Sequence, residues 1–178
     1  MRIIAGLYRG RPLVAPSGQE TRPTADRTRE TLFSMLTSRL GSFEDLAIAD
    51  LFAGSGALGL EALSRGAASC IFVEQDKAAV DTIRANATKL GIRADIRQTS
   101  VLSLGPTPKP LDLILMDPPY ASGAGAVALD KLGRLGWTGP ATWIAIETGM
   151  SETIDVKGFE IETDRKVGKA RLHLLRAA

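Results

Sequence analysis

Short apolar runs and helix-like periods alternate along the chain from residue 46 to residue 148. Runs with strand character lie at 46–52, 69–74, 94–100, 111–117 and 142–148. Amphipathic periods predict helices between them, at 57–65, at 76–90 with Asp76 as the N-cap, and at 124–135. Strands that alternate with helices in this way predict an α/β fold with a mostly parallel, doubly wound sheet. Ligands of such sheets bind at the carboxyl ends of the strands.

The two ends of the chain show a different pattern. Residues 1–14 predict two short strands around a Gly/Arg turn, and 159–176 alternate polar and apolar positions, which predicts an antiparallel hairpin. A helix is expected over 25–40, with Thr24 as its N-cap and Gly41 as its stop. We therefore expect an N-terminal basic β-hairpin extension over 1–21 and one larger domain over 22–178.

Composition narrows the class of protein mainly by exclusion. Of the 178 residues, 44% are hydrophobic and 24% charged, as in a soluble globular protein. No stretch without a charge exceeds twelve residues, the length of Pro118 to Leu129, and a membrane-spanning helix needs ~20. The first residues lack the apolar core of a signal peptide. One cysteine, Cys70, and one histidine, His173, allow neither an internal disulfide nor a Cys/His zinc cage, and we interpret both as structural. We expect a cytoplasmic protein without a bound metal and without a membrane partner.

The net charge of +2 conceals an uneven distribution. Residues 1–30 and 157–178 together carry +6, and the middle of the chain carries −4. A basic rim around a mildly acidic body is typical of nucleic-acid binders. The alternative is that these arginines and lysines only solvate two edge hairpins.

A glycine-rich loop, DLFAGSGALG, closes the first strand of the alternating series at 50–59. Glycine lets the backbone turn sharply and approach a ligand closely. Glu74 ends the next strand, where a carboxylate can accept both ribose hydroxyls of an adenosine. Gly54, Gly56 and Gly59 also match the dinucleotide fingerprint, so NAD is a competing cofactor, and a tight turn without a ligand is a further alternative. No Lys-Ser/Thr pair follows the glycines, which excludes a nucleoside-triphosphate P-loop.

The tetrapeptide Asp117-Pro118-Pro119-Tyr120 follows the fourth strand of the series. A stiff exit turn explains the two prolines but not the flanking acid and aromatic residue. An exocyclic amine of a nucleobase is a poor nucleophile because its lone pair is delocalised into the ring. The Asp117 carboxylate and the Pro118 carbonyl can accept its two N–H groups and pull the nitrogen toward a pyramidal geometry. Tyr120 can stack on a base that has left its helix. The tetrapeptide therefore predicts methylation of an amine.

S-adenosylmethionine suits such a site, because its sulfonium already makes the methyl group an electrophile. The protein needs only to align amine, methyl and sulfur, and positioning of this kind contributes ~7–11 kcal/mol. After transfer the nitrogen is cationic and loses a proton, either to Asp117 or to water.

These motifs together resemble the RsmD family, bacterial methyltransferases that modify a guanine N2 in the 16S rRNA of the small ribosomal subunit. The similarity covers nearly the whole chain. It rests on IAGLYRGRPLVAP at the start, RPTADRTRETLFSML (22–36), LFAGSGALGLEALSRGA (51–67), FVEQD (72–76) and DPPY. The Arg-Pro-Thr signature and the GSGALGLEALSRGA run are much more specific than DPPY, which many amino-methyltransferases share. The resemblance implies a Rossmann-like S-adenosylmethionine-dependent methyltransferase fold.

The resemblance also implies roles for individual residues. Contacts with the cofactor are implied for Asp50, Gly54, Ser55, Gly56, Glu74, Ser100 and Thr24. Catalytic roles are implied for Asp117, Pro118 and Tyr120. At position 100 the family often has Asn or Asp instead of Ser.

Basic residues outside these motifs are candidates for contact with RNA. Three arginines crowd at the start of the helix expected over 25–40, where they can meet phosphate or the carboxylate of the cofactor: Arg22, Arg27 and Arg29. We hypothesise contacts with the rRNA backbone for five further residues: Arg9, Arg11, Lys166, Lys169 and Arg171. The alternative for both groups is an ordinary solvated surface.

Four functions therefore remain open at the level of sequence. The favoured one is a monomeric rRNA guanine-N2 methyltransferase that acts on 16S rRNA or the small ribosomal subunit. The second is another amine methyltransferase, acting on the N6 of DNA adenine or on a protein glutamine, although 178 residues leave little room for a separate DNA-recognition domain. An NAD-dependent oxidoreductase is the third, and it leaves DPPY without a role. The last is an RNA-binding module without catalysis.

Overall fold

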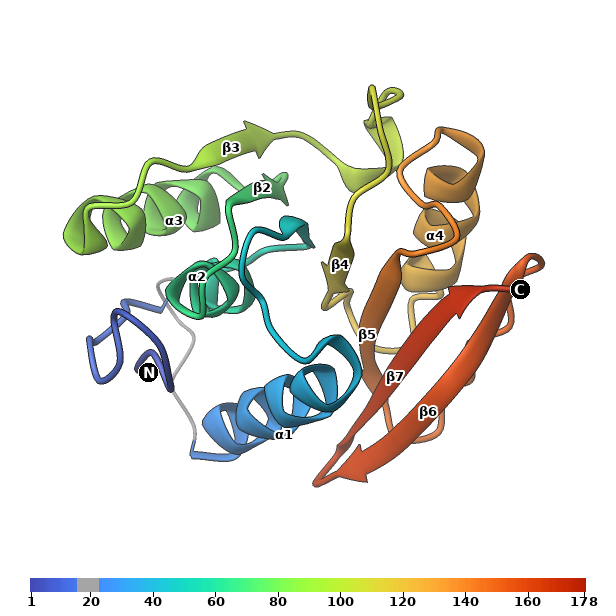
Figure 1. Cartoon of the computed structure of the whole chain (residues 1–178), viewed down its shortest axis with the longest axis horizontal. Coiled ribbons are helices and arrows are strands. Elements are labelled where there is room, and N and C mark those ends of the chain that lie inside the picture. Colours follow the sequence, from blue (N-terminus) through green and yellow to red (C-terminus); the bar gives the residue numbers. More distant parts are fainter. Residues whose placement is uncertain (16–22) are drawn as a thin grey trace.

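A seven-stranded sheet forms the centre of the molecule, with the strand order β3-β2-β1-β4-β5-β7-β6 (Figure 1). The computed structural model describes residues 1–15 and 23–178, and the side chains of residues 1–15 and 25–178. Five strands pair in parallel: β1 (Ala47–Leu51), β2 (Ser69–Glu74), β3 (Asp95–Gln98), β4 (Leu113–Met116) and β5 (Trp143–Gly149). The last two, β6 (Phe159–Val167) and β7 (Ala170–Ala177), form an antiparallel hairpin against β5. The predicted α/β fold with a C-terminal hairpin is confirmed.

Helices cover both faces of the sheet and bury two apolar cores. One face is covered by α1 (Pro23–Leu40), α2 (Ala57–Ser64) and α3 (Lys77–Leu90). The other face is covered by α4 (Ala124–Arg134) and the short 3₁₀ helix η1 (Val101–Ser103). Strand β4 is buried along its whole length, because it is covered on both faces.

Local signals explain most helix ends, with one exception. The Asp76 side chain caps α3 by accepting from the backbone N–H of Ala79 at 3.0 Å, as expected. Gly41, with φ +74°, ends α1. The predicted N-cap at Thr24 is wrong, because α1 already begins at Pro23, a residue type favoured at the first helical position.

The N-terminal segment folds back on itself, but the two predicted strands are wrong. Only an isolated antiparallel bridge forms, between Arg2 and Pro12. The physical reason is that other groups use the backbone N–H donors. Ile4 and Ala5 donate to the Glu61 carboxylate of α2 at 2.7 and 3.0 Å, so these donors are not available to a ladder.

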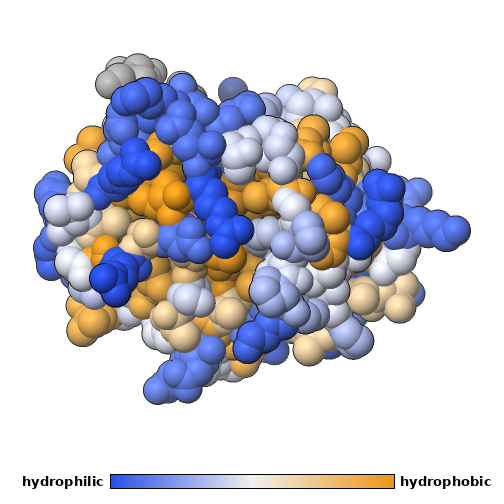
Figure 2. Space-filling view, turned by 90° about the horizontal axis from the view of Figure 1, so that it is seen from above, coloured by the Kyte–Doolittle hydropathy of each residue, from blue (hydrophilic) through white to orange (hydrophobic). Residues whose placement is uncertain are grey.

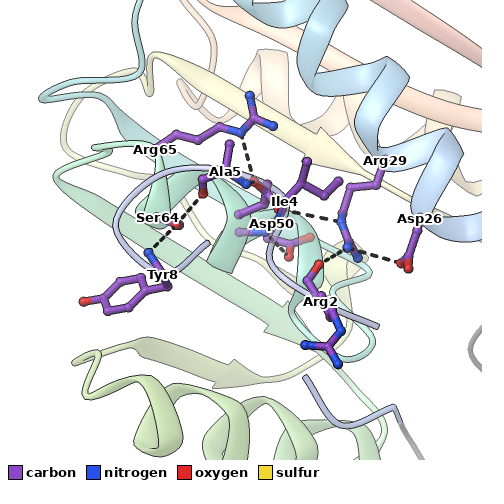
Figure 3. A network of polar contacts seen from close by, with 11 residues as sticks. Arg2, Ile4, Ala5, Tyr8, Asp26, Arg29, Asp50, Ser64 and Arg65 are labelled. Carbon is purple, nitrogen blue, oxygen red and sulfur yellow. Dashed lines mark hydrogen bonds and ion pairs between the residues drawn. The ribbon is translucent and has the colours of Figure 1, made fainter. Parts of the chain in front are cut away.

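This segment is part of the core rather than a separate arm (Figure 3). Ile3 and Leu13 are buried in the core that contains α1 and α2. Tyr8 donates its backbone N–H to the Ser64 hydroxyl at 3.0 Å, as Figure 3 shows. Gly6, with φ +88°, lies so close to α2 that a Cβ would be 1.9 Å from the carbonyl oxygen of Ser64. The contact therefore requires glycine at this position.

The surface combines charged and apolar groups. On the face shown in Figure 2, apolar patches are small and hydrophilic residues separate them. Within the described ranges, no helix has the length and apolar character to cross a membrane.

Glu61 is the residue whose loss we expect to destabilise this arrangement most. It is fully buried, and its carboxylate also accepts from Arg65 Nε at 2.9 Å. Glu61→Ala leaves two backbone N–H groups and a guanidinium without their acceptor, so we expect a loss of about 3–5 kcal/mol in the free energy of unfolding. Urea denaturation measures it, with the exposed Glu30→Ala on α1 as a control expected within about 0.5 kcal/mol of wild type. Equal midpoints for the two variants would contradict this role of Glu61.

Candidate active site

Two adjoining cavities open at the carboxyl edge of the parallel strands. The larger, of about 390 Å³, is bordered by Glu74 and Ser100, and the smaller, of about 230 Å³, by Asp50. Gly54 and Asp117 line both cavities, so the two meet where β1 and β4 end. Together they fall in the range of small-molecule sites, ~300–1,000 Å³.

The glycine loop bends sharply beside the larger cavity. Gly54 has φ +58°, and its backbone N–H donates to Glu74 Oε2 at 2.9 Å. The other oxygen of Glu74 accepts from the backbone N–H of Asp76 at 3.0 Å. Gly59 allows α2 to pack closely on β2, since a Cβ there would lie 2.4 Å from Phe72 Cε1. This hydrogen bond fixes the position of the loop relative to Glu74, which lies twenty residues after Gly54 in the sequence.

Asp50 contributes a buried carboxylate with an unused oxygen. Its Oδ2 accepts from the backbone N–H of Gly59 at 2.9 Å, whereas its buried Oδ1 has no hydrogen-bond partner among the described residues. Burial raises the pKa of Asp50 well above its ordinary value, and the nearby carboxylates of Asp117 and Glu74 raise it further. A buried orphan acceptor is unusual in a folded protein and indicates a missing donor.

Arg29 provides the opposite charge in the same cavity. Its Nη2 donates to the carbonyl oxygen of Arg2 and, at 3.3 Å, to Asp26 (Figure 3). Its buried Nε lies 3.9 Å from Glu61 Oε1, an ion pair without a hydrogen bond, and burial lowers the pKa of the guanidinium. Arg29 and Asp50 line the smaller cavity together. The free oxygen of Asp50 fits the ammonium group of an α-amino acid, and the Arg29 guanidinium fits its carboxylate; S-adenosylmethionine carries both groups.

The tetrapeptide lies at the junction of the cavities. Asp117 follows β4 and lines both cavities, while Pro118 and Tyr120 line the larger one. Partial removal from water and the nearby charge of Glu147 raise the pKa of Asp117. The motifs predict one site for these residues and the glycine loop, and the structure brings them together.

Two glutamates that the sequence did not single out accept hydrogen bonds from Tyr120 and from Ala121, the residue after the tetrapeptide. Tyr120 is 50% exposed, and its hydroxyl donates to Glu147 Oε1 at 2.7 Å. Ala121, with φ +57°, donates its backbone N–H to Glu152 Oε1 at 2.7 Å. Glu147 lies near the carboxyl end of the fifth predicted strand. Glu74 was selected because it is an acid at the carboxyl end of a strand, and the same rule would have selected Glu147.

Two predicted cofactor residues have structural contacts as well. Ser100 lines the larger cavity, and its hydroxyl accepts from the backbone N–H of Leu102 at the start of η1. Ser55 lines the smaller cavity, and its carbonyl accepts from the Asn86 side chain of α3 at 3.0 Å. Arg22 and the side chain of Thr24 lie outside the described residues.

The basic residues proposed for RNA contact divide into two groups. Lys169 lies in the turn between β6 and β7, and the pairing of Ala170 with Gly149 places that turn beyond the carboxyl end of β5. Arg27 is exposed near the start of α1, on the side of the helix away from Ala25, Thr28 and Arg29, which line the smaller cavity. Both therefore border the edge that carries the cavities.

Arg9 and Arg11 lie at the other end of the helices. Arg9 follows Tyr8, which contacts the last residue of α2, and Arg11 donates to the carbonyl oxygen of Lys89 near the end of α3 at 2.8 Å. Both helices start at the cavity edge and run away from it, and eight residues of helix span about 12 Å. The structure therefore does not bring Arg9 and Arg11 to the mouth of the cavities.

Cys70 and His173 are both buried, and His173 Nε2 lies 2.9 Å from the Thr148 hydroxyl. Neither lines a cavity described above. In the described part of the chain, no three or more His, Cys, Asp or Glu residues gather as a metal ion would require.

The strand order, the glycine loop with its acid, and the opposite charges of Asp50 and Arg29 in one cavity define the class: an S-adenosylmethionine-dependent methyltransferase. The magnesium protoporphyrin IX methyltransferase of Synechocystis, solved with S-adenosylmethionine bound, has a TM-score of 0.68 and covers 90% of this chain and 87% of its own. At 12% identity this likeness is one of fold alone.

Sequence comparison identifies the family. A family model described as "Conserved hypothetical protein 95" matches residues 1–176. Ribosomal RNA small subunit methyltransferase D of Escherichia coli is 37% identical over 83% of this chain and 74% of its own length, and that of Haemophilus influenzae is 38% identical over 83% and 78%. A solved putative methyltransferase from Escherichia coli superposes with a TM-score of 0.85 at 33% identity, covering 99% of this chain and 97% of that one. The chain belongs to this family, the RsmD family that its motifs resemble.

Removal of the buried charge at Asp50 should have opposite effects on stability and on cofactor affinity. In the unfolded chain Asp50 has its ordinary pKa of 3.8 and releases its proton above that pH. In the folded, ligand-free protein the raised pKa keeps the proton bound. Asp50 therefore lowers the free energy of unfolding as the pH rises. We expect Asp50→Asn to raise the Tm at pH 8 by about 2–4 °C for each kcal/mol gained, and to weaken S-adenosylmethionine binding at least tenfold.

Differential scanning calorimetry at pH 5 and pH 8, with titration calorimetry of the cofactor, makes both measurements. The difference in Tm between variant and wild type should be larger at pH 8. A variant that loses stability at pH 8 and binds cofactor normally would show that the charge of Asp50 serves the fold alone.

Proposed function

We propose that the protein transfers a methyl group from S-adenosylmethionine to the exocyclic N2 amine of a guanine in the 16S rRNA of the small ribosomal subunit. Relatives named ribosomal RNA small subunit methyltransferase D support an rRNA substrate. One observation supports a methyl-transfer site here most directly: Asp117 lines both cavities, so it lies where the two halves of a cofactor site meet. The sulfonium of S-adenosylmethionine joins its adenosyl and methionine halves.

Each cavity has the polar groups that one half of the cofactor requires. In the larger cavity, Glu74 would accept from the ribose hydroxyls and Ser100 would lie near the adenine. In the smaller cavity, Asp50 Oδ1 would accept from the ammonium group and the Arg29 guanidinium would donate to the carboxylate. Gly54, Ser55 and Gly56 would let the backbone approach the cofactor.

The chain's own residues prepare the target amine. When bound, S-adenosylmethionine supplies a methyl group on a sulfonium centre, which leaves as a neutral thioether. Asp117 and the Pro118 carbonyl accept the two amine hydrogens, which draws the lone pair out of conjugation with the ring. The raised pKa of Asp117 also makes it a suitable acceptor for the proton that the nitrogen loses after transfer. The Tyr120 ring, half exposed at the mouth, offers a surface on which the base stacks.

The charges at the mouth suit the backbone of a folded RNA. Lys169 and Arg27 border the cavity edge and would contact phosphates, which position the RNA without reading its sequence. Arg9 and Arg11 lie on a side face and would act only on a large substrate that extends around the protein, as the small ribosomal subunit does.

Asp117→Ala tests the chemistry. We expect it to lower methyl transfer at least about 100-fold, because the amine loses an acceptor, while cofactor affinity stays within about twofold. Labelled cofactor and small ribosomal subunits from a strain that lacks the modification provide the assay, with mass spectrometry of the product nucleoside. Asp112→Asn, at the amino end of the same strand, is the matched control and should transfer at the wild-type rate. Unchanged turnover in Asp117→Ala would remove this residue from the mechanism.

Reversal of charge at the mouth tests RNA contact. Arg27→Glu and Lys169→Glu should each raise the KM for the subunit several-fold, leave kcat nearly unchanged and flatten the dependence of KM on salt, since each removes a phosphate contact. Lys157→Glu is the control. Lys157 precedes β6 at the end of the sheet where the parallel strands begin, opposite the end that carries the cavities. Equal KM values for the three variants would show that the mouth residues do not contact RNA.

A further inference from the structure

Glu147 has no part in the methyl transfer described above, yet it lies beside the catalytic acid. In the parallel pairing of β4 and β5, Met116 lies opposite Ile146, so Asp117 and Glu147 follow paired residues on neighbouring strands. Both line the smaller cavity. The strand order places Glu74 and the glycine loop on one side of Asp117 and Glu147 on the other. Glu147 therefore borders the smaller cavity on the side of Asp117 away from Glu74 and the glycine loop.

One oxygen of this carboxylate is held and the other faces no protein donor. Tyr120 donates its hydroxyl to Oε1 at 2.7 Å. Among the residues that the structure describes, no group donates to Oε2, and no Lys or Arg forms an ion pair with Glu147. The side chain is half-buried, so Oε2 keeps access to the cavity.

The Tyr120 hydrogen bond also favours the charged form of the carboxylate. Burial raises the pKa of Glu147, and the bond from Tyr120 opposes this effect. An ionised carboxylate is an acceptor only, so it accepts an N–H and repels a lone pair. Tyr120 in this way contacts one oxygen of Glu147 and offsets part of the effect of burial, while burial still raises the pKa overall.

Guanine and adenine differ at the position where such an acceptor acts. The ring nitrogen N1 next to the N2 amine of guanine carries a hydrogen, whereas N1 next to the N6 amine of adenine carries a lone pair. Enzymes that extrude a base read its Watson–Crick edge with hydrogen bonds. Once Asp117 and the Pro118 carbonyl accept the amine hydrogens, the N1–H is the next donor along the guanine edge.

We propose that Glu147 determines the base specificity of the site: its free oxygen accepts the N1–H of the target guanine while Tyr120 holds the other oxygen. This inference rests on the proposed function. Guanine satisfies the carboxylate, and adenine would place its N1 lone pair against a negative charge. A site built to accept a hydrogen bond rejects an analogue that lacks the donor strongly, because the buried acceptor is left unpaired.

A substrate analogue separates this role from simple support of Tyr120. 2-Aminopurine keeps the amine of guanine but has no hydrogen on N1. Small subunits reconstituted with 16S rRNA that contains either guanine or 2-aminopurine at the target position are the two substrates. We expect the wild-type kcat/KM to be at least about 100-fold higher for guanine.

We expect Glu147→Gln to lower the ratio of kcat/KM for guanine to kcat/KM for 2-aminopurine to less than about tenfold, mainly because it loses activity on guanine. Its amide still accepts from Tyr120 but presents an NH₂ group where the free oxygen was. Tyr120→Phe should keep most of the ratio, because it leaves the carboxylate in place, even if it lowers both rates. Glu152→Gln, which alters the neighbouring glutamate, is the matched control and should preserve the ratio. Titration of S-adenosylmethionine into each variant reports whether the site is folded.

The outcomes are distinct. An unchanged ratio in Glu147→Gln with normal cofactor binding overturns the proposal. A ratio that falls equally in Tyr120→Phe shows that Glu147 acts only as a support for the ring, which also overturns it. If wild-type enzyme forms no N2-methylguanosine at the target position, the proposed function itself fails, independently of Glu147.

Discussion

Parallel pairing at the centre of the sheet is the constraint on which the site depends. Leu51 lies opposite both Val73 and Met116, and Met116 lies opposite Ile146. Since parallel strands share one direction, the residue that follows each of these emerges at the same edge. Four side chains from widely separated parts of the chain meet there for this reason: Phe52, Glu74, Asp117 and Glu147. The sheet positions them, and the loops contribute the turns between them.

This edge collects more negative charge than the protein neutralises. The acids at this edge are Asp50, Glu74, Asp117 and Glu147, and no Lys or Arg in the described ranges forms an ion pair with any of them. Burial and mutual repulsion raise the pKa of Asp50 and of Asp117. These two carboxyl groups therefore make the ligand-free protein less stable as the pH rises. S-adenosylmethionine carries a sulfonium and an ammonium group. Its binding relieves the repulsion, and Asp50, the acid that we place against the ammonium group, both weakens the free protein and favours the cationic cofactor.

The sequence predicted the features that depend on periodicity or on local chemistry. Buried strands read as apolar runs, and the cap at Asp76 depends only on residues three apart. Features that depend on contacts between distant segments were not predictable in the same way. Glu61 sits in an ordinary helical pattern, and nothing near it in sequence indicates that it captures the N–H groups of Ile4 and Ala5 and prevents strand formation. The place of Arg29 in the smaller cavity likewise depends on how α1 packs against α2 and the N-terminal segment.

The course of the two chain ends bears on how the protein can be handled. Met1 lines the smaller cavity, and the first fifteen residues are packed against α2 and α3. β7 instead runs away from the cavity edge, and Ala178 donates its backbone N–H to the carbonyl of Gly158 at the far side of the sheet. An affinity tag fused ahead of Met1 would therefore emerge beside the smaller cavity, whereas one fused after Ala178 would emerge at the opposite edge of the sheet. Immobilisation through the carboxyl end keeps the edge that carries both cavities facing solvent.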